Sequence, residues 1–205
     1  MAREMNNAPL QAEALANQAA LFMESGQGGR ALSVSREAVA RANAAHDQRL
    51  ILLTRLQAAE ASQSVRDLVD VARKASAFGL APIEAATHMA LARVHLAAGR
   101  TKEASLQAEH ARGVAAPMHL RDVLFQACYL GAKALKAQGQ ATSAVDQFSA
   151  SLGYLEEMRR GLAGADLRLF LGRPVTVAFA KDAEPAFQNA NRPQDSARLR
   201  ALLSP

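Results

Sequence analysis

The sequence predicts an all-α fold of paired helices, and three observations lead to this prediction. Alanine supplies nearly a quarter of the 205 residues, whereas aromatic residues supply only 4% and tryptophan is absent. Such a chain fills its interior by bringing helix backbones close together, because it has few large side chains to fill a wide gap. Strand signals are missing apart from a β-leaning patch at Val175–Val177, and apolar residues recur at helical spacing between short turns.

The clearest helical hairpin lies in the central stretch Ala86–Pro117. Two amphipathic segments meet there at Gly99, and small residues at Ala92, Ala104 and Ala111 allow the two helices to approach closely. The spacing of these four positions resembles that of the tetratricopeptide (TPR) repeat, a helix-turn-helix unit of about 34 residues. The resemblance implies a superhelix of stacked hairpins.

The same repeat spacing extends through most of the chain. The first hairpin carries the full small-residue skeleton, at Ala19, Gly26, Ala31 and Ala38. The second has Ser62 and Gln63 where the others have a glycine, but it keeps the period: 37 residues separate Ala31 from Leu68, 36 separate Leu68 from Ala104, and 40 separate Ala104 from Ala144. We therefore expect about four TPR-like repeats at residues 9–45, 47–79, 82–116 and 118–162.

The two ends of the chain are expected to differ from the repeats. Residues 1–8 are polar, and we expect them to be disordered. Residues 163–205 are expected to form a C-terminal helical cap, because the last repeat of a solenoid exposes an apolar face that some other segment must cover. The segment Leu167–Val175 is similar to the C-terminal segments that close TPR arrays in bacterial regulators. The expected anchors of the cap are Phe170, Phe179, Phe187 and Leu199.

Motifs for catalysis and for cofactor or metal binding are missing from the sequence. The Gly26–Gly29 cluster is not followed by the Lys-Ser/Thr of a phosphate-binding loop, and there is no nucleophile elbow, HExxH motif or paired-cysteine zinc pattern. His88 and His95 share a helical face but lack a nearby third ligand, so a core role for His95 is the better interpretation. The lone Cys128 lies on an apolar face and is expected to be an inert buried thiol. We predict no catalytic residue, no metal site, no cofactor and no enzymatic activity.

Charge and hydropathy suggest the compartment and the class of partner. The formal net charge is +5, but Arg and Lys are scattered through every expected helix, which does not indicate a nucleic-acid surface. No apolar run approaches the roughly 18 residues that a membrane span needs. We therefore expect a cytoplasmic protein that binds neither nucleic acid nor membrane.

The TPR resemblance also implies a binding site, because the first helix of each repeat lines a concave groove. On this alignment the groove residues are Gln57, Arg93, Gln126, Tyr129, Lys133 and Lys136. The C-terminal half of the groove is basic, so we expect a partner segment of acidic character. In this hypothesis Arg93, Lys133 and Lys136 pair with carboxylates and Tyr129 supplies an aromatic contact.

The favoured function is a non-enzymatic protein–protein interaction scaffold that binds a peptide or partner-protein segment, in bacterial signalling or regulation. One alternative is a module that associates with a second copy to form a homodimer. Another is an RNA-binding helical repeat, which is less favoured because RNA-reading repeats keep a nearly fixed period and recurrent polar positions.

Overall fold

The structure, a computed structural model, describes residues 7–204 apart from the side chain of Glu24. Within these residues it contains eleven α-helices and one 3-10 turn and no strand, which confirms the predicted all-α fold. Most of the segment expected to be disordered, residues 1–6, lies outside the described residues, and the first helix already begins at Ala8, where Asn7 caps it. The chain divides into two compact units, residues 1–90 and residues 91–205, which are described separately.

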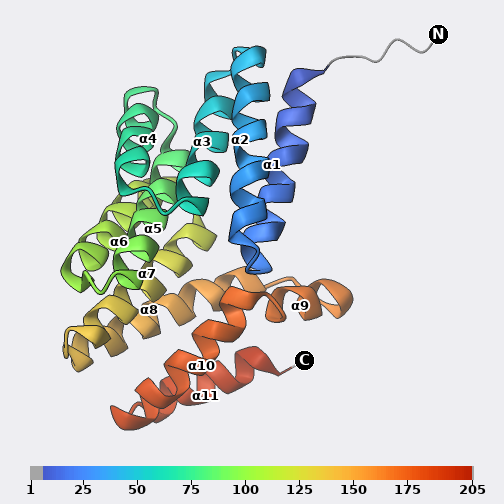
Figure 1. The fold of residues 1–205 in the computed structure, drawn as a ribbon. Helices are drawn as coiled ribbons and strands as arrows, with labels where there is room; N and C mark the ends of the chain where they lie inside the picture. Colours follow the sequence, from blue (N-terminus) through green and yellow to red (C-terminus); the bar gives the residue numbers. More distant parts are fainter. Residues whose placement is uncertain (1–6, 205) are drawn as a thin grey trace. The chain divides into compact units, whose positions relative to one another are not determined.

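Unit 1 is built from two helical hairpins and the first part of a fifth helix. Its helices are α1 (Ala8–Glu24), α2 (Gly28–Ala45), α3 (Gln48–Ala61), α4 (Val65–Ala77) and residues 81–90 of α5 (Ala81–Ala97). Helix α2 packs against α1 and α3, and α3 packs against α1 and α4 (Figure 1). Ala19 of α1 and Ala31 and Ala38 of α2 are fully buried, so these small residues of the predicted skeleton lie in the packed interior between helices.

The turns within the helical hairpins share one geometry. In each, the second of three linking residues has a left-handed backbone, with φ of 73° at Gly26, 53° at Gln63, 70° at Gly99, 77° at Gly139 and 53° at Asn191. Glycine adopts this conformation without a steric penalty, whereas a residue with a Cβ pays about 1–2 kcal/mol. Gln63 therefore marks a strained turn in the second hairpin.

Replacing Gln63 with glycine should raise the free energy of unfolding by about 1 kcal/mol. The Gln63 side chain is exposed, so its loss removes no packing. The reverse change Gly99→Gln should lower the free energy by a similar amount, because a Cβ at Gly99 would meet no atom within 4 Å and only the backbone conformation is penalised. Urea denaturation followed by circular dichroism measures both; equal stability of Gln63→Gly and wild type would contradict the strain.

Unit 2 continues the pattern of helical hairpins. It comprises residues 91–97 of α5, α6 (Thr101–Ala115), the 3-10 turn η1 (Ala116–Met118), α7 (Arg121–Ala137), α8 (Ala141–Arg159), α9 (Gly164–Leu171), α10 (Pro174–Asn189) and α11 (Pro193–Leu203). Helix α7 packs against α6 and α8. The α6–α7 contact is close because it uses small residues: a Cβ added to Gly131 would lie 3.8 Å from the Cβ of Ala108.

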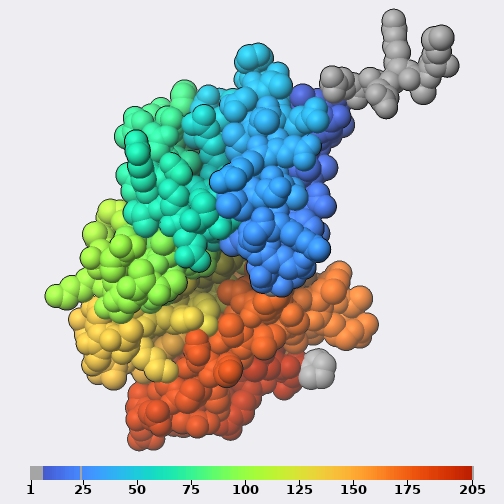
Figure 2. Space-filling model, viewed as in Figure 1, coloured from blue at the N-terminus to red at the C-terminus, as the bar shows by residue number. Residues whose placement is uncertain are grey.

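The C-terminal helices α10 and α11 form a further hairpin that packs on α8. In Figure 2 the atoms of this C-terminal segment are the red and orange-red ones. An aromatic cluster joins them to the repeats: the ring of Phe179 lies edge-on to Phe125 at 5.5 Å and to Tyr129 at 5.6 Å between centroids, and Phe187 lies edge-on to Phe148 at 6.5 Å. Of the expected cap anchors, Phe179, Phe187 and Leu199 are buried, and Phe170 packs on the same cluster while partly exposed.

A polar network fixes α11 to α8 beside the aromatic cluster. The buried carboxylate of Asp195 pairs with Arg192 and Arg198, each at 2.8 Å, and accepts a hydrogen bond of 3.0 Å from Ser149 on α8. Arg198 also forms a bidentate contact with Glu156 of α8, at 2.7 and 3.0 Å. Bidentate guanidinium–carboxylate pairs are directional, so they fix the orientation of α11 on α8.

Candidate functional site

A cavity of about 590 Å³ opens between α5, α7 and α10 in unit 2. We call it the α5–α7–α10 cavity. Its lining residues are Arg93, Leu96 and Ala97 of α5, Gln126, Tyr129, Leu130, Lys133 and Ala137 of α7, and Pro174, Val175 and Ala178 of α10. Most of the wall is apolar, and two cations and one amide lie on it. Such a surface suits an apolar side chain accompanied by a polar or acidic group.

The structure brings four of the six predicted groove residues together in this cavity: Arg93, Gln126, Tyr129 and Lys133. Lys136 is exposed and lines a neighbouring hollow of about 360 Å³, formed by the start of α8 and the end of α10. Gln57 is partly buried on α3 and belongs to unit 1. Four of the six predicted residues therefore line one cavity, and Lys136 and Gln57 lie outside it.

Tyr129 belongs mainly to the core rather than to an open surface. Only 5% of the residue is exposed, and its ring packs against those of Phe148 and Phe179. Its hydroxyl donates a hydrogen bond of 2.6 Å to Asp182 on α10. Burial, and then Asp182, raise the pKa of Tyr129 well above its usual range, so the hydroxyl stays protonated. Tyr129 therefore leaves little exposed surface for the predicted aromatic contact with a partner.

Lys133 is the accessible cation of the α7 wall, with 45% of its side chain exposed. Its ammonium lies 3.9 Å from Asp182 and 5.4 Å from the centroid of the Tyr129 ring. Asp182 therefore offsets part of the charge that the acidic-partner hypothesis assigns to Lys133. A partner carboxylate would have to share this cation with Asp182.

A second carboxylate of the chain lies close to the cavity. Asp122 accepts a hydrogen bond of 2.8 Å from Gln126 and pairs with Arg173 at 2.6 Å. Sequence reasoning identified neither Asp122 nor Asp182, because it assigned the groove to the repeats alone and treated the C-terminal segment only as a cap. The available signal was the placement of Asp182 three residues after Phe179, which puts both on one face of α10.

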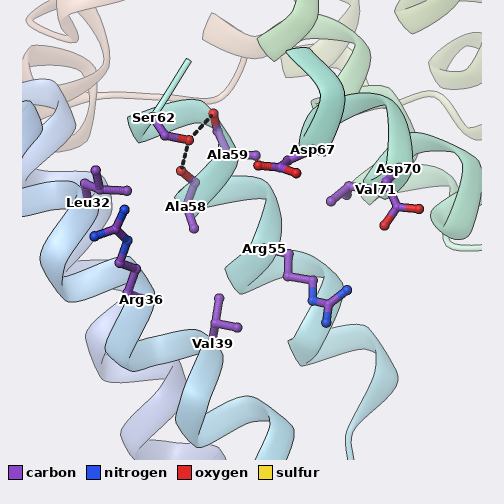
Figure 3. A pocket seen from close by; sticks show the side chains of 10 residues that line it. All are labelled: Leu32, Arg36, Val39, Arg55, Ala58, Ala59, Ser62, Asp67, Asp70 and Val71. Carbon is purple, nitrogen blue, oxygen red and sulfur yellow. Dashed lines mark hydrogen bonds between the residues drawn. The ribbon is translucent and has the colours of Figure 1, made fainter. Parts of the chain in front are cut away.

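Unit 1 holds a separate hollow of about 320 Å³ between α2, α3 and α4. Figure 3 shows Arg36 on the α2 wall, Arg55 on α3, and Asp67 and Asp70 on α4. Asp70 is already paired with Lys74 at 2.6 Å and with Arg73 at 2.8 Å, and Lys74 followed by Arg73 lowers its pKa. The hollow thus carries charges of both signs and offers a mixed polar surface.

Among the side chains that the structure describes, no group of three or more His, Cys, Asp or Glu could hold a metal ion. Burial raises the pKa of the Cys128 thiol, against a weaker opposing effect of Arg112. A buried thiol of this kind is a poor nucleophile. None of the helices in the described part of the chain is long and apolar enough to span a bilayer.

Comparisons with known proteins identify the fold. No family model matches the sequence, and no curated protein matches it. Two solved structures of TPR-like repeats, from a protein of Podosopora anserina described as a kinesin light chain, match the structure with TM-scores of 0.55 and 0.54. Each is 18% identical and covers 95% of this chain, and the matches span 93% and 95% of those chains. The fold is TPR-like.

The TPR-like fold confirms the resemblance that was inferred from the small-residue skeleton. Folds of this kind generally mediate protein–protein interaction, and they present extended concave surfaces for it. When the helices are counted in pairs from α1, α5 is the first helix of the third pair and α7 is the first helix of the fourth pair. The α5–α7–α10 cavity lies between these two helices, with α10 as a third wall.

Proposed function

We propose that the chain is a non-enzymatic protein-interaction module that binds a segment of a partner protein in the α5–α7–α10 cavity. The observation that carries this proposal is the convergence of Arg93, Gln126 and Lys133 on one apolar hollow formed by two first helices of neighbouring repeats. The cavity is large enough for a bulky side chain. Its rim supplies cations and an amide for hydrogen bonds to the partner.

The chemistry of the wall defines the partner segment that fits. Leu96, Leu130 and Val175 favour an aliphatic or aromatic side chain, which supplies most of the affinity when it is desolvated. Lys133 favours a nearby carboxylate, although Asp182 limits its contribution. We propose a partner with an apolar anchor residue flanked by acidic residues, encountered in the cytoplasm in bacterial signalling or regulation, on the strength of the sequence resemblance.

RNA binding is disfavoured by the same cavity. Asp122 and Asp182 lie beside its polar groups, and their carboxylates would repel a phosphate backbone. Nucleic-acid grooves are generally lined by basic residues without such acids.

Filling the cavity should weaken binding of the partner segment. Peptides of about 12 residues are selected from a display library on the wild-type protein, and their affinities are measured by fluorescence anisotropy. Ala97→Trp places a large ring on the cavity wall and should weaken binding at least about tenfold. The matched control is Ala98→Trp, because Ala98 is an exposed neighbour that does not line the cavity. Peptides that bind Ala97→Trp as tightly as wild type would show that the segment binds elsewhere.

Neutralising Lys133 tests the acidic character of the partner. Lys133→Gln should weaken binding of an acidic selected peptide by about three- to tenfold and reduce its dependence on salt. The control is Lys181→Gln, at an exposed lysine of α10 that does not line the cavity. Equal losses at Lys133 and Lys181 would indicate a general charge effect, and no loss at Lys133 would leave the apolar anchor as the source of affinity.

A further inference from the structure

Gln126 places a side-chain amide on the α7 wall of the α5–α7–α10 cavity. Its Nε2 donates a hydrogen bond of 2.8 Å to Oδ2 of Asp122, one turn earlier on the same helix. A carboxylate only accepts hydrogen bonds, so this contact fixes which end of the amide is the nitrogen. The carbonyl oxygen lies on the other side of the amide, and no residue that the structure describes donates a hydrogen bond to it. Gln126 therefore brings an unused acceptor to the cavity wall.

Arg173 holds Asp122 in place from outside the repeats. Its guanidinium pairs at 2.6 Å with Oδ1 of Asp122, the carboxylate oxygen that Gln126 does not use. Arg173 directly precedes Pro174, the first residue of α10, and its backbone has the extended conformation that a following proline favours, with ψ of 132°. Both oxygens of Asp122 are thus engaged, and Arg173 offsets its charge. The orientation of the Gln126 amide therefore depends on the C-terminal segment.

The free oxygen of Gln126 favours a partner that brings an N–H group. An extended segment presents unpaired backbone N–H and C=O groups, whereas the middle of a helix uses both internally. Lys133 lies seven residues after Gln126 on the same face of α7, and its ammonium is a donor for a partner oxygen. The α7 wall thus offers one acceptor and one donor, which is the combination that an extended backbone with an acidic side chain requires.

We propose that Gln126 accepts a backbone N–H from the partner segment and that the segment binds in an extended conformation. Asp122 and Arg173 are positioning residues, because they act through the amide of Gln126. The contact rests on the function proposed for the α5–α7–α10 cavity, and it adds the conformation of the partner. Seven residues of helix rise about 10 Å, which about three residues of an extended chain span, so the N–H lies about three residues from the acidic residue that meets Lys133.

An amide-to-ester scan of a peptide tests the contact. The probe is the tightest of the 12-residue peptides selected on the wild-type protein, with each backbone amide replaced in turn by an ester, which lacks the N–H. At one position the ester should weaken binding to wild type by about three- to tenfold, as expected for one hydrogen bond. The same ester should have no effect on binding to Gln126→Leu, because this variant lacks the acceptor.

The matched control is Gln188→Leu. Gln188 also donates a hydrogen bond of 2.8 Å to a carboxylate four residues earlier, that of Glu184, but it does not line the cavity, so its loss should leave every ester effect unchanged. Suppose that the peptide is sensitive to Ala97→Trp but every ester has the same effect on wild type and Gln126→Leu. This result would overturn the hydrogen bond and leave the proposed function standing. A peptide insensitive to Ala97→Trp would overturn both.

The role of Arg173 is measured through the same ester. Arg173→Gln should reduce the effect of that ester to less than about twofold, because Asp122 is then no longer held beside Gln126. Arg173→Lys keeps a cation next to Asp122 and should restore part of the effect. A general loss of charge or stability would weaken the amide and ester peptides alike and leave their ratio unchanged. A wild-type ratio in Arg173→Gln would therefore overturn the positioning role.

Discussion

Replacing Phe148 with alanine should lower the free energy of unfolding by about 3–5 kcal/mol. Phe148 is fully buried on α8, and its ring centroid lies 6.2 Å from that of Tyr129, 6.3 Å from that of Phe179 and 6.5 Å from that of Phe187. The substitution leaves a cavity at the point where α7, α8 and α10 meet, and it also removes favourable ring contacts. Urea denaturation followed by circular dichroism gives the free energy.

The control for this change is Phe78→Ala, since Phe78 is 57% exposed in unit 1. It removes the same atoms from a surface position and should cost less than about 0.5 kcal/mol. If the two variants were equally stable, the aromatic cluster would not be the structural centre of unit 2.

The aromatic cluster links stability to the candidate site. Phe179 of α10 packs in this cluster, while Val175 and Ala178 of the same helix form one wall of the α5–α7–α10 cavity. The position of that wall therefore depends on the burial of Phe179 and on the hydrogen bond from Tyr129 to Asp182 of α10. Supporting a surface from a packed core keeps its shape fixed.

The repeats could be predicted from the sequence because small residues and turns recur at fixed offsets. Ala31, Ala104 and Ala144 lie five residues after the left-handed turn residue, and all three are buried. The second hairpin forms although Gln63 replaces glycine, because packing around Leu56 and Leu68 outweighs the strain of one turn. Periodicity of burial is a stronger signal than any one turn residue.

The structure of the C-terminal segment, residues 163–205, is less predictable from the sequence because this segment carries no repeat skeleton. The patch Val175–Val177 has strand propensity, yet it lies in the first turns of α10, where Pro174 occupies the first helical position. Thr176 and Phe179, three residues apart, both face the core. Helical spacing of buried residues thus overrides the local preference of β-branched side chains.

The candidate site was only partly predictable, for a related reason. The positions predicted on α5 and α7 were chosen from the repeat geometry, and the structure brings Arg93, Gln126 and Lys133 together in one cavity. The position of α10 beside α7 depends on tertiary packing and leaves no periodic pattern in the sequence. The third wall of the cavity and the contact with Asp182 could therefore not be predicted from the sequence. The burial of Tyr129 follows from that same contact.

Replacing Ala104 with leucine should lower the free energy of unfolding by about 1–3 kcal/mol. Ala104 is fully buried on α6, at the position of the skeleton where neighbouring helices approach closely. A leucine there adds three carbon atoms to a closely packed contact, so it must push the helices apart or take up a strained rotamer. The cost arises although leucine is more apolar and is nearly as good a helix former as alanine.

The matched control is Ala150→Leu, because Ala150 is an exposed alanine within α8. Its leucine variant should be within about 0.5 kcal/mol of wild type. Urea denaturation of the pair separates overpacking from a general effect of leucine in a helix. If Ala104→Leu were as stable as Ala150→Leu, close backbone approach at the alanine skeleton would not be what holds these hairpins together, and the alanine-rich composition would not explain the fold.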